Sequence, residues 1–339
     1  MDYRKFYKIN CGLFLGLLIF GCEPAQQEKV YLGQTQGTTY AIKTISSSKE
    51  NLQPAIDSVL QVIDLTFSNY NNQSLLYKIN QGADTLRVND MFAEVFKTSE
   101  KIYQASGKLF DPTVGSLVKA WGFGATDTLT VNEKQIESLL ALTGFEKVSL
   151  LKDQTLAKCC PNIYLDFNAI AQGYTSDVMS KMLKQKGIEN FMVEIGGEVY
   201  ASGMNTLKNK PWTIGIDDPQ SPVNERKLAA KVKLSNLGLA TSGNYRKFKV
   251  DAKTGKKYVH TINPIIGYPK MSNILSTTVI APTAMEADGY ATAFMLMDLE
   301  KTHALLQKNK DLQVMIIYLD VNNQTKQYTT AGFKDLILK

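Results

Sequence analysis

The order in which helical and β-type stretches follow one another most constrains the fold of this chain. Apolar periodicity and helix-end signals predict helices at residues 53–67, 90–106, 132–144, 171–186 and 284–297. The β-type stretches are 30–43, 145–151, 162–166, 191–195, 212–216, 228–234, 247–250, 276–280 and 314–318. The two kinds do not alternate strictly, as they would in a doubly wound parallel sheet. We therefore expect an α+β fold of mainly antiparallel sheets with packed helices.

The composition predicts a globular protein that does not bind nucleic acid. A chain of 339 residues with 44% hydrophobic and 21% charged residues can bury a sizeable core, which excludes disordered and collagen-like classes. The net charge is +6, but the lysines are spread evenly and form no long basic run. Only two histidines occur, His260 and His303, so any site that needs three imidazoles is excluded.

The N-terminus has the pattern of a bacterial lipoprotein signal. A basic stretch precedes an uncharged run at residues 11–21, which is too short to span a bilayer. The run ends at Ile19-Phe20-Gly21-Cys22, in which an aliphatic residue stands three before the cysteine and a small residue directly before it. Phe20 fits this pattern poorly. The alternative is a short membrane anchor that is not cleaved.

This pattern divides the chain into a signal peptide (1–21), a tether (22–29) and a folded domain (30–339). We expect Cys22 to carry the lipid that holds the protein to a bacterial membrane, with the domain facing the periplasm or the exterior. The cysteines that remain are Cys159 and Cys160. Adjacent cysteines rarely bond to each other, so no disulfide framework is expected.

Short segments rich in glycine and polar residues interrupt the periodic pattern. Each by itself is more often a turn than a functional site. In chain order they are GTTY (37–40), FDPTVG (110–115), WGFG (121–124), DFNAIAQGY (166–174), IGG (195–197), TSGNY (241–245), HTINP (260–264) and ADGYAT (287–292).

Taken together and in this order, the segments resemble the ApbE family, the FAD:protein FMN transferases. The resemblance runs from about Gly33 to Met297. It implies that the chain cleaves the pyrophosphate of FAD with Mg²⁺, attaches FMN to a Thr or Ser hydroxyl of a target protein and releases AMP. It also implies acceptors such as subunits of Rnf-type or sodium-pumping NADH:quinone reductase complexes.

A metal site is predicted around Asp288 and Thr292. They lie four residues apart in a predicted helix, so their carboxylate and hydroxyl share one face. Mg²⁺ prefers such oxygen ligands, and the resemblance adds the carbonyl of Ala169. Without the resemblance, a helix-face Asp and a Thr bonded to the backbone would be the simpler interpretation.

His260 is the only histidine inside one of the segments. A neutral imidazole can take the proton of an acceptor hydroxyl near neutral pH, so we expect His260 to be the general base. His303 lies in a polar helical stretch, where a solvated side chain is expected.

The resemblance also implies the residues that contact FAD. Tyr70 corresponds to the aromatic residue beside the flavin, where stacking would add affinity. Two positions depart from the family, because Gln36 stands where Met is usual and Gln172 where Lys or Glu is frequent. The implied set is Gln36, Tyr70, Leu109, Phe110, Asp111, Asp166, Gln172 and Ile262.

Two alternatives remain open at this level. If water replaces the protein hydroxyl, the chain is an FAD pyrophosphatase that yields FMN and AMP. A lipoprotein that holds flavin without catalysis is the other, although simple storage needs no base.

Overall fold

The computed structural model describes residues 25–83, 85–123, 131–222, 224–243, 248–250, 257–259, 261–270 and 272–338. The strands are β1 (Gln27–Thr35), β2 (Thr38–Ser46), β3 (Thr85–Arg87), β4 (Val148–Leu150), β5 (Thr155–Lys158), β6 (Asn190–Ile195), β7 (Glu198–Ser202), β8 (Trp212–Asp217), β9 (Leu228–Leu234), β10 (Leu237–Gly243), β11 (Phe248–Val250), β12 (Lys257–Val259), β13 (Ile274–Ala281), β14 (Gln313–Leu319) and β15 (Thr325–Thr329). The helices are α1 (Gln53–Phe67), α2 (Leu75–Asn80), α3 (Asp90–Ala105), α4 (Gly115–Ala120), α5 (Glu133–Leu140), α6 (Ala171–Gln185), α7 (Ala284–Leu296), α8 (Leu299–Lys308) and α9 (Ala331–Leu336), with short 3₁₀ turns η1 (Pro112–Val114) and η2 (Phe145–Lys147).

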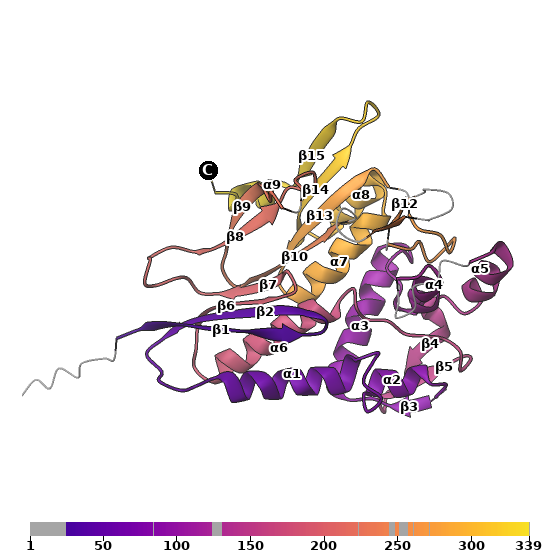
Figure 1. Cartoon of the computed structure of the whole chain (residues 1–339), viewed down its shortest axis with the longest axis horizontal. Helices are drawn as coiled ribbons and strands as arrows, with labels where there is room; N and C mark the ends of the chain where they lie inside the picture. Colours follow the sequence, from indigo (N-terminus) through magenta and orange to yellow (C-terminus); the bar gives the residue numbers. More distant parts are fainter. Residues whose placement is uncertain are drawn as a thin grey trace, which may run out of the picture.

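An eight-stranded sheet in the order β1-β2-β6-β7-β10-β13-β14-β15 forms the centre of the molecule (Figure 1). Every neighbouring pair in this sheet is antiparallel. The smaller sheets β3-β5-β4, β8-β9 and β11-β12 are antiparallel as well. The expected α+β fold of mainly antiparallel sheets is therefore confirmed.

The two faces of the central sheet bury different partners. Along β13, Val279 packs into the cluster formed with α3 and α7, whereas its neighbour Ile280 packs into the cluster under β8 and β9. Ile316 and Ile317 of β14 divide in the same way. This alternation is the two-residue period of a strand with both faces covered, by helices on one side and by a hairpin on the other.

All five predicted helices are present, and some predicted strands differ. Asn132 and Gln135 form the expected reciprocal cap at the start of α5. The stretch 30–43 is a hairpin rather than one strand, because Gln36 (φ 50°) and Gly37 (φ 71°) form a tight turn. The prediction of a strand at 162–166 is wrong: this segment is irregular, since its backbone bonds to side chains and loops instead of a neighbouring strand.

Within the described ranges, no helix is both long and apolar enough to cross a membrane. The predicted signal peptide and Cys22 lie outside those ranges. Cys159 and Cys160 are free thiols, as expected, with their sulfur atoms 3.7 Å apart.

Candidate functional site

Helices α6 and α7 approach each other so closely that only glycine fits between them. A Cβ on Gly173, in the first turn of α6, would lie 2.3 Å from the carbonyl oxygen of Ala284 and 2.8 Å from the Cβ of Asp288. Gly238 of β10 meets the start of α7 in the same way, because a Cβ atom added to it would lie 2.2 Å from the nitrogen of Ala284. These two glycines bring α7 against both α6 and the sheet.

Polar contacts fix this approach from both sides. Asp177 of α6 accepts hydrogen bonds of 2.8 Å from the backbone nitrogens of Ala284 and Met285, the first residues of α7. A carboxylate at a helix N-terminus also complements the helix dipole. In the other direction, the N–H of Gly173 donates to Oδ2 of Asp288 at 3.1 Å. The carboxylate of Asp288 is thereby placed against the first turn of α6.

The first turn of α6 lies next to a carbonyl oxygen without a backbone donor. Gly173 is the third residue of α6, where a backbone N–H has no partner within its own helix, and this N–H donates to Asp288. The carbonyl of Ala169 lies just before the helix, and among the described residues no backbone N–H donates to it. The structure therefore brings Asp288 to a turn that carries an available carbonyl oxygen.

The donors fit a hard divalent cation. Asp288 is 6% exposed and Thr292 is half-buried one helical turn later. The Thr292 hydroxyl lies 3.3 Å from that of Ser242 at the end of β10. Among described residues, no group of three or more His, Cys, Asp or Glu side chains is placed to hold a metal. A carboxylate, a hydroxyl and a carbonyl leave coordination positions for phosphate and water, as Mg²⁺ prefers.

Gln36 and Gln172 lie at the same end of α6. From the β1-β2 turn, Nε2 of Gln36 donates to Oγ1 of Thr175 at 2.6 Å. The side-chain amide of Gln172 packs against the turn between β6 and β7. A Cβ atom added to Gly196 in this turn would lie only 3.0 Å from that amide. Two hairpin turns of the sheet thus meet the first turns of α6 beside Asp288.

A second group of predicted residues surrounds Asp166. Its backbone nitrogen donates to the carbonyl of Pro112 at 2.7 Å, which joins it to the segment containing Asp111. Burial raises the pKa of the Asp166 carboxyl. On α4, Gly115 allows close contact with Asp166, and the Nζ of Lys119 lies 3.4 Å from the ring centre of Tyr164.

Asn80 connects the Tyr70 loop to the Asp166 segment. Its side-chain amide donates to Oδ1 of Asn69 and to the carbonyl of Leu165, and its Oδ1 accepts from the Leu165 nitrogen, each at 2.8 Å. Tyr70 itself is 74% exposed, so its ring is available for stacking. Asn80 therefore positions an exposed aromatic ring relative to the half-buried carboxyl group of Asp166.

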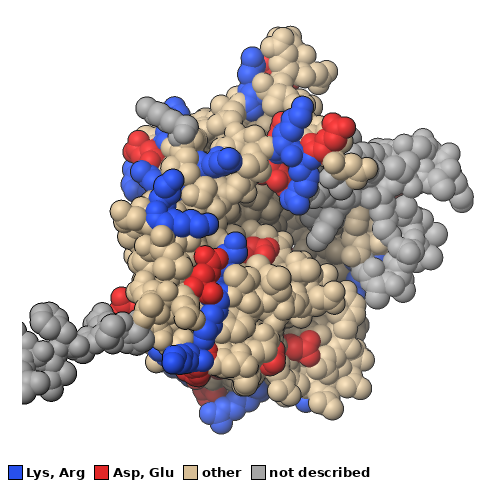
Figure 2. Space-filling model, turned by 60° about the vertical axis from the view of Figure 1, so that its left-hand side comes forward, with Lys and Arg blue, Asp and Glu red and all other residues tan. Residues whose placement is uncertain are grey.

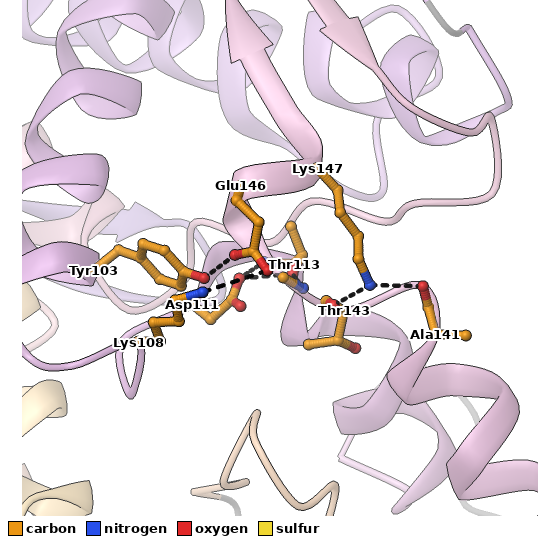
Figure 3. Close-up of polar contacts among 9 residues, drawn as sticks. Tyr103, Lys108, Asp111, Thr113, Ala141, Thr143, Glu146 and Lys147 are labelled. Carbon is orange, nitrogen blue, oxygen red and sulfur yellow. Dashed lines mark hydrogen bonds and ion pairs between the residues drawn. The ribbon is translucent and has the colours of Figure 1, made fainter.

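The segment that carries Leu109, Phe110 and Asp111 is held by the polar network in Figure 3. Leu109 and Phe110 bury their side chains in the largest hydrophobic cluster. Asp111 Oδ1 accepts from the nitrogen and hydroxyl of Thr113 at 2.8 and 2.6 Å, and the Thr113 hydroxyl accepts from the Gly144 nitrogen at 2.7 Å. Burial raises the pKa of the Asp111 carboxyl.

Further along Figure 3, Glu146 accepts from the Tyr103 hydroxyl and lies 3.6 Å from the Lys108 ammonium. The Tyr103 bond is the main reason that the Glu146 pKa is lowered. These contacts connect Tyr103 of α3 and Glu146 of η2 to Lys108, which directly precedes the segment of Leu109, Phe110 and Asp111.

The remaining predicted site residues are His260 and Ile262 of the 260–264 segment. Ile262 is 4% exposed and packs with Leu117, Trp121 and Ile136. His260 lies outside the described residues. His303 is an exposed residue of α8 whose ring lies 4.3 Å from that of Tyr328, as expected for a residue outside the site.

Sequence reasoning missed Gly173, Asp177 and Asn80 as positioning residues. Gly173 and Asp177 belong to or closely follow the DFNAIAQGY segment, and a glycine near a helix start signals close packing. Nothing local marks Asn80, since its partners are far along the chain.

Comparison with known proteins shows the family of this chain. The model of the ApbE family matches residues 36–316. The chain is 33% identical over 331 residues to the FAD:protein FMN transferase of Vibrio cholerae, covering 95% of this chain and 97% of that protein. It is 32% identical over 335 residues to the FAD:protein FMN transferase of Haemophilus influenzae, covering 95% of each. The solved flavin transferase ApbE from Vibrio cholerae superposes with a TM-score of 0.82 at 32% identity, over 92% of this chain and 99% of that one. Since the match spans most of its length, the chain belongs to the ApbE family.

Proposed function

We propose that this chain transfers FMN from FAD to a Thr or Ser hydroxyl of a target protein, with Mg²⁺, and releases AMP. Relatives with that activity in their names are about one-third identical over most of the chain. The local observation that carries the proposal is the bond from the Gly173 N–H to Asp288, which holds this carboxylate beside a turn whose Ala169 carbonyl accepts no backbone N–H among the described residues.

Asp288, Thr292 and the Ala169 carbonyl would hold the cation. When bound, Mg²⁺ lowers the cost of negative charge that develops on the phosphates. The acceptor oxygen attacks the phosphorus on the FMN side of the pyrophosphate. The bond from this phosphorus to the bridging oxygen breaks, and AMP leaves with that oxygen. His260 takes the proton of the acceptor hydroxyl as general base.

The remaining predicted residues bind FAD. Tyr70 stacks on the flavin, and Asn80 keeps its loop in place relative to Asp166. Gln36 and Gln172 contact the cofactor as neutral amides, and the bond of Gln36 to Thr175 orients the first of them. The resemblance also implies that Leu109, Phe110, Asp111 and Ile262 lie near FAD, although the side chains of Leu109, Phe110 and Ile262 are packed in hydrophobic clusters.

A matched pair of variants tests the proposal. Purified protein is incubated with FAD and a candidate acceptor, with and without Mg²⁺, and AMP release and the intact mass of the acceptor are measured. Asp288→Asn should abolish both signals because it removes the only charged cation ligand. Asp298→Asn is the control, since Asp298 is largely exposed and pairs with Lys270. Wild-type turnover in Asp288→Asn would refute the metal assignment.

The same assay separates the alternatives. AMP release with no change in acceptor mass, for every acceptor tried, identifies a pyrophosphatase. Flavin binding without AMP release identifies a non-catalytic carrier. AMP release that requires Mg²⁺, together with an FMN-sized mass increase on the acceptor, supports transfer.

Localisation and acceptor complete the proposal. The signal at residues 1–21 directs export and is removed, and the lipidated Cys22 then holds the protein on a bacterial membrane, where it faces the periplasm or the exterior. The acceptor is a subunit of a membrane redox complex, such as an Rnf-type or NADH:quinone reductase complex. These statements rest on the sequence pattern and the family resemblance.

A further inference from the structure

The first described residues of the chain are fixed to a loop at one end of the central sheet. The side-chain oxygen of Gln26 accepts from the hydroxyl of Thr206 at 2.6 Å. Thr206 belongs to a loop between β7 and β8, residues 204–210, which we call the basic loop. The bridge between Asn205 and Lys210 closes this loop.

The tether is too short to let the basic loop move far from the lipid. Gln26 follows Cys22 by only four residues. Four extended residues reach at most about 14 Å. With Cys22 acylated, as proposed above, the loop that holds Gln26 stays within about that distance of the bilayer surface.

The chemistry of the basic loop fits an anionic lipid surface. Leu207 is 51% exposed, and Lys208 and Lys210 beside it are exposed. Lys233, opposite Thr213 near the start of β8, adds a third exposed ammonium group. None of these lysines forms an ion pair with another residue of the described part of the chain.

The surroundings are basic as well. Figure 2 looks at the molecule from the side of β8 and β9, and Lys and Arg side chains gather over the upper part of this face, with a few acidic side chains between them. Two exposed acidic residues adjoin the loop: Glu28, two residues after Gln26, and Glu189, whose carbonyl oxygen lies near Gly203. An apolar side chain among unpaired lysines is typical of surfaces that contact anionic headgroups.

We propose that the basic loop, together with Lys233, rests on the anionic surface of the membrane that holds Cys22, and that this contact orients the active site away from the bilayer. The inference rests on the proposed lipid anchor. Strand β1 starts beside the basic loop and runs nine residues to the turn that contains Gln36. Nine residues of strand span about 30 Å. The acceptor hydroxyl would therefore be presented up to about 30 Å above the membrane, on a domain or extended segment that reaches that height.

Energy transfer from single labels to lipid dyes measures this orientation in the acylated full-length protein. Cys159→Ser and Cys160→Ser remove the free thiols at the surface. One label is then placed at Thr213→Cys, beside the basic loop. The other is placed at Val321→Cys, which is 98% exposed in the turn after β14, at the opposite end of the sheet. On vesicles of phosphatidylcholine with 30 mol% phosphatidylglycerol, the first label should lie much closer to the lipid dye.

Charge reversal tests the role of the lysines. One lysine beside an anionic leaflet contributes about fivefold to partitioning, so Lys208→Glu with Lys210→Glu should lower the oriented population by about 25-fold or more. The two labels should then give similar transfer, as they should in high salt. Lys152→Glu with Lys301→Glu reverses two exposed lysines away from the loop and should change nothing.

The outcomes are distinct. Equal transfer from the two labels in the unreversed protein, or an unchanged difference after reversal in the basic loop, would overturn the proposal. If the reversed variant also loses the transfer of FMN to a soluble acceptor protein, the basic loop binds the acceptor protein instead of the membrane. Failure of the anchor is detected separately, because the protein would then stay in the supernatant and lack the mass of the acyl chains.

Discussion

Gly173→Ala tests whether the contact between α6 and α7 controls both stability and catalysis. The new Cβ would lie 2.3 Å from the Ala284 carbonyl oxygen, whereas ordinary contacts begin about 1 Å farther away. Because the opposing atom belongs to the backbone, no side-chain rotation relieves the clash, and the helices must separate. Overpacking of this kind costs about 1–3 kcal/mol. The gain of helix propensity, at most about 1 kcal/mol, offsets only part of it.

The same displacement should slow the reaction more than it lowers stability. Asp288 is held by the N–H of Gly173, and a misplacement of about 1 Å in a site can cost about 100-fold in rate. Thermal unfolding and Mg²⁺-dependent AMP release are measured on the same preparation. Gly215→Ala in β8 is the control, because its Cβ would meet only the flexible end of Leu228. A Gly173→Ala protein with wild-type stability and rate would show that α6 and α7 accommodate the extra methyl group without cost, and would refute the reasoning.

Four further changes have defined outcomes. Asn80→Ala leaves the buried Leu165 backbone without its partners, so the free energy of unfolding measured with denaturant should fall by about 2–4 kcal/mol. FAD binding, measured by fluorescence titration, should also weaken. Unchanged FAD affinity would contradict the positioning role of Asn80. Burial raises the pKa of Asp111, so the folded state keeps that proton to higher pH than the unfolded chain, and stability is lost as pH rises from about 4 through the raised pKa. Asp111→Asn should make the free energy of unfolding less dependent on pH in this range. An equally steep dependence in the variant would contradict this role of Asp111. His260→Ala should slow single-turnover transfer by about 10²–10⁴-fold with FAD binding retained, and a near-normal rate would exclude it as the base. Cys22→Ala should release the protein from the membrane fraction or block its processing, whereas a membrane-bound protein of wild-type size would indicate a retained helix.

The sequence by itself determined the features that depend on neighbours in the chain. Apolar residues at helical spacing predicted α1 and α3, and the cap at Asn132 predicted the start of α5, because these signals act within one or two helical turns. The absence of strict alternation predicted antiparallel sheets. The spacing of Asp288 and Thr292 placed both on one face of α7 for the same local reason.

Only the tertiary structure decided how distant segments meet. The strand prediction at 162–166 was wrong because Asn80, some 85 residues away in the chain, takes the backbone bonds of Leu165 that a neighbouring strand would otherwise make. The bond from Gly173 to Asp288 joins residues 115 positions apart, and it gives an acceptor to a first-turn N–H that has no partner within its own helix. Such contacts depend on the packing of α6 against α7, and no pattern within either segment specifies how closely two helices approach.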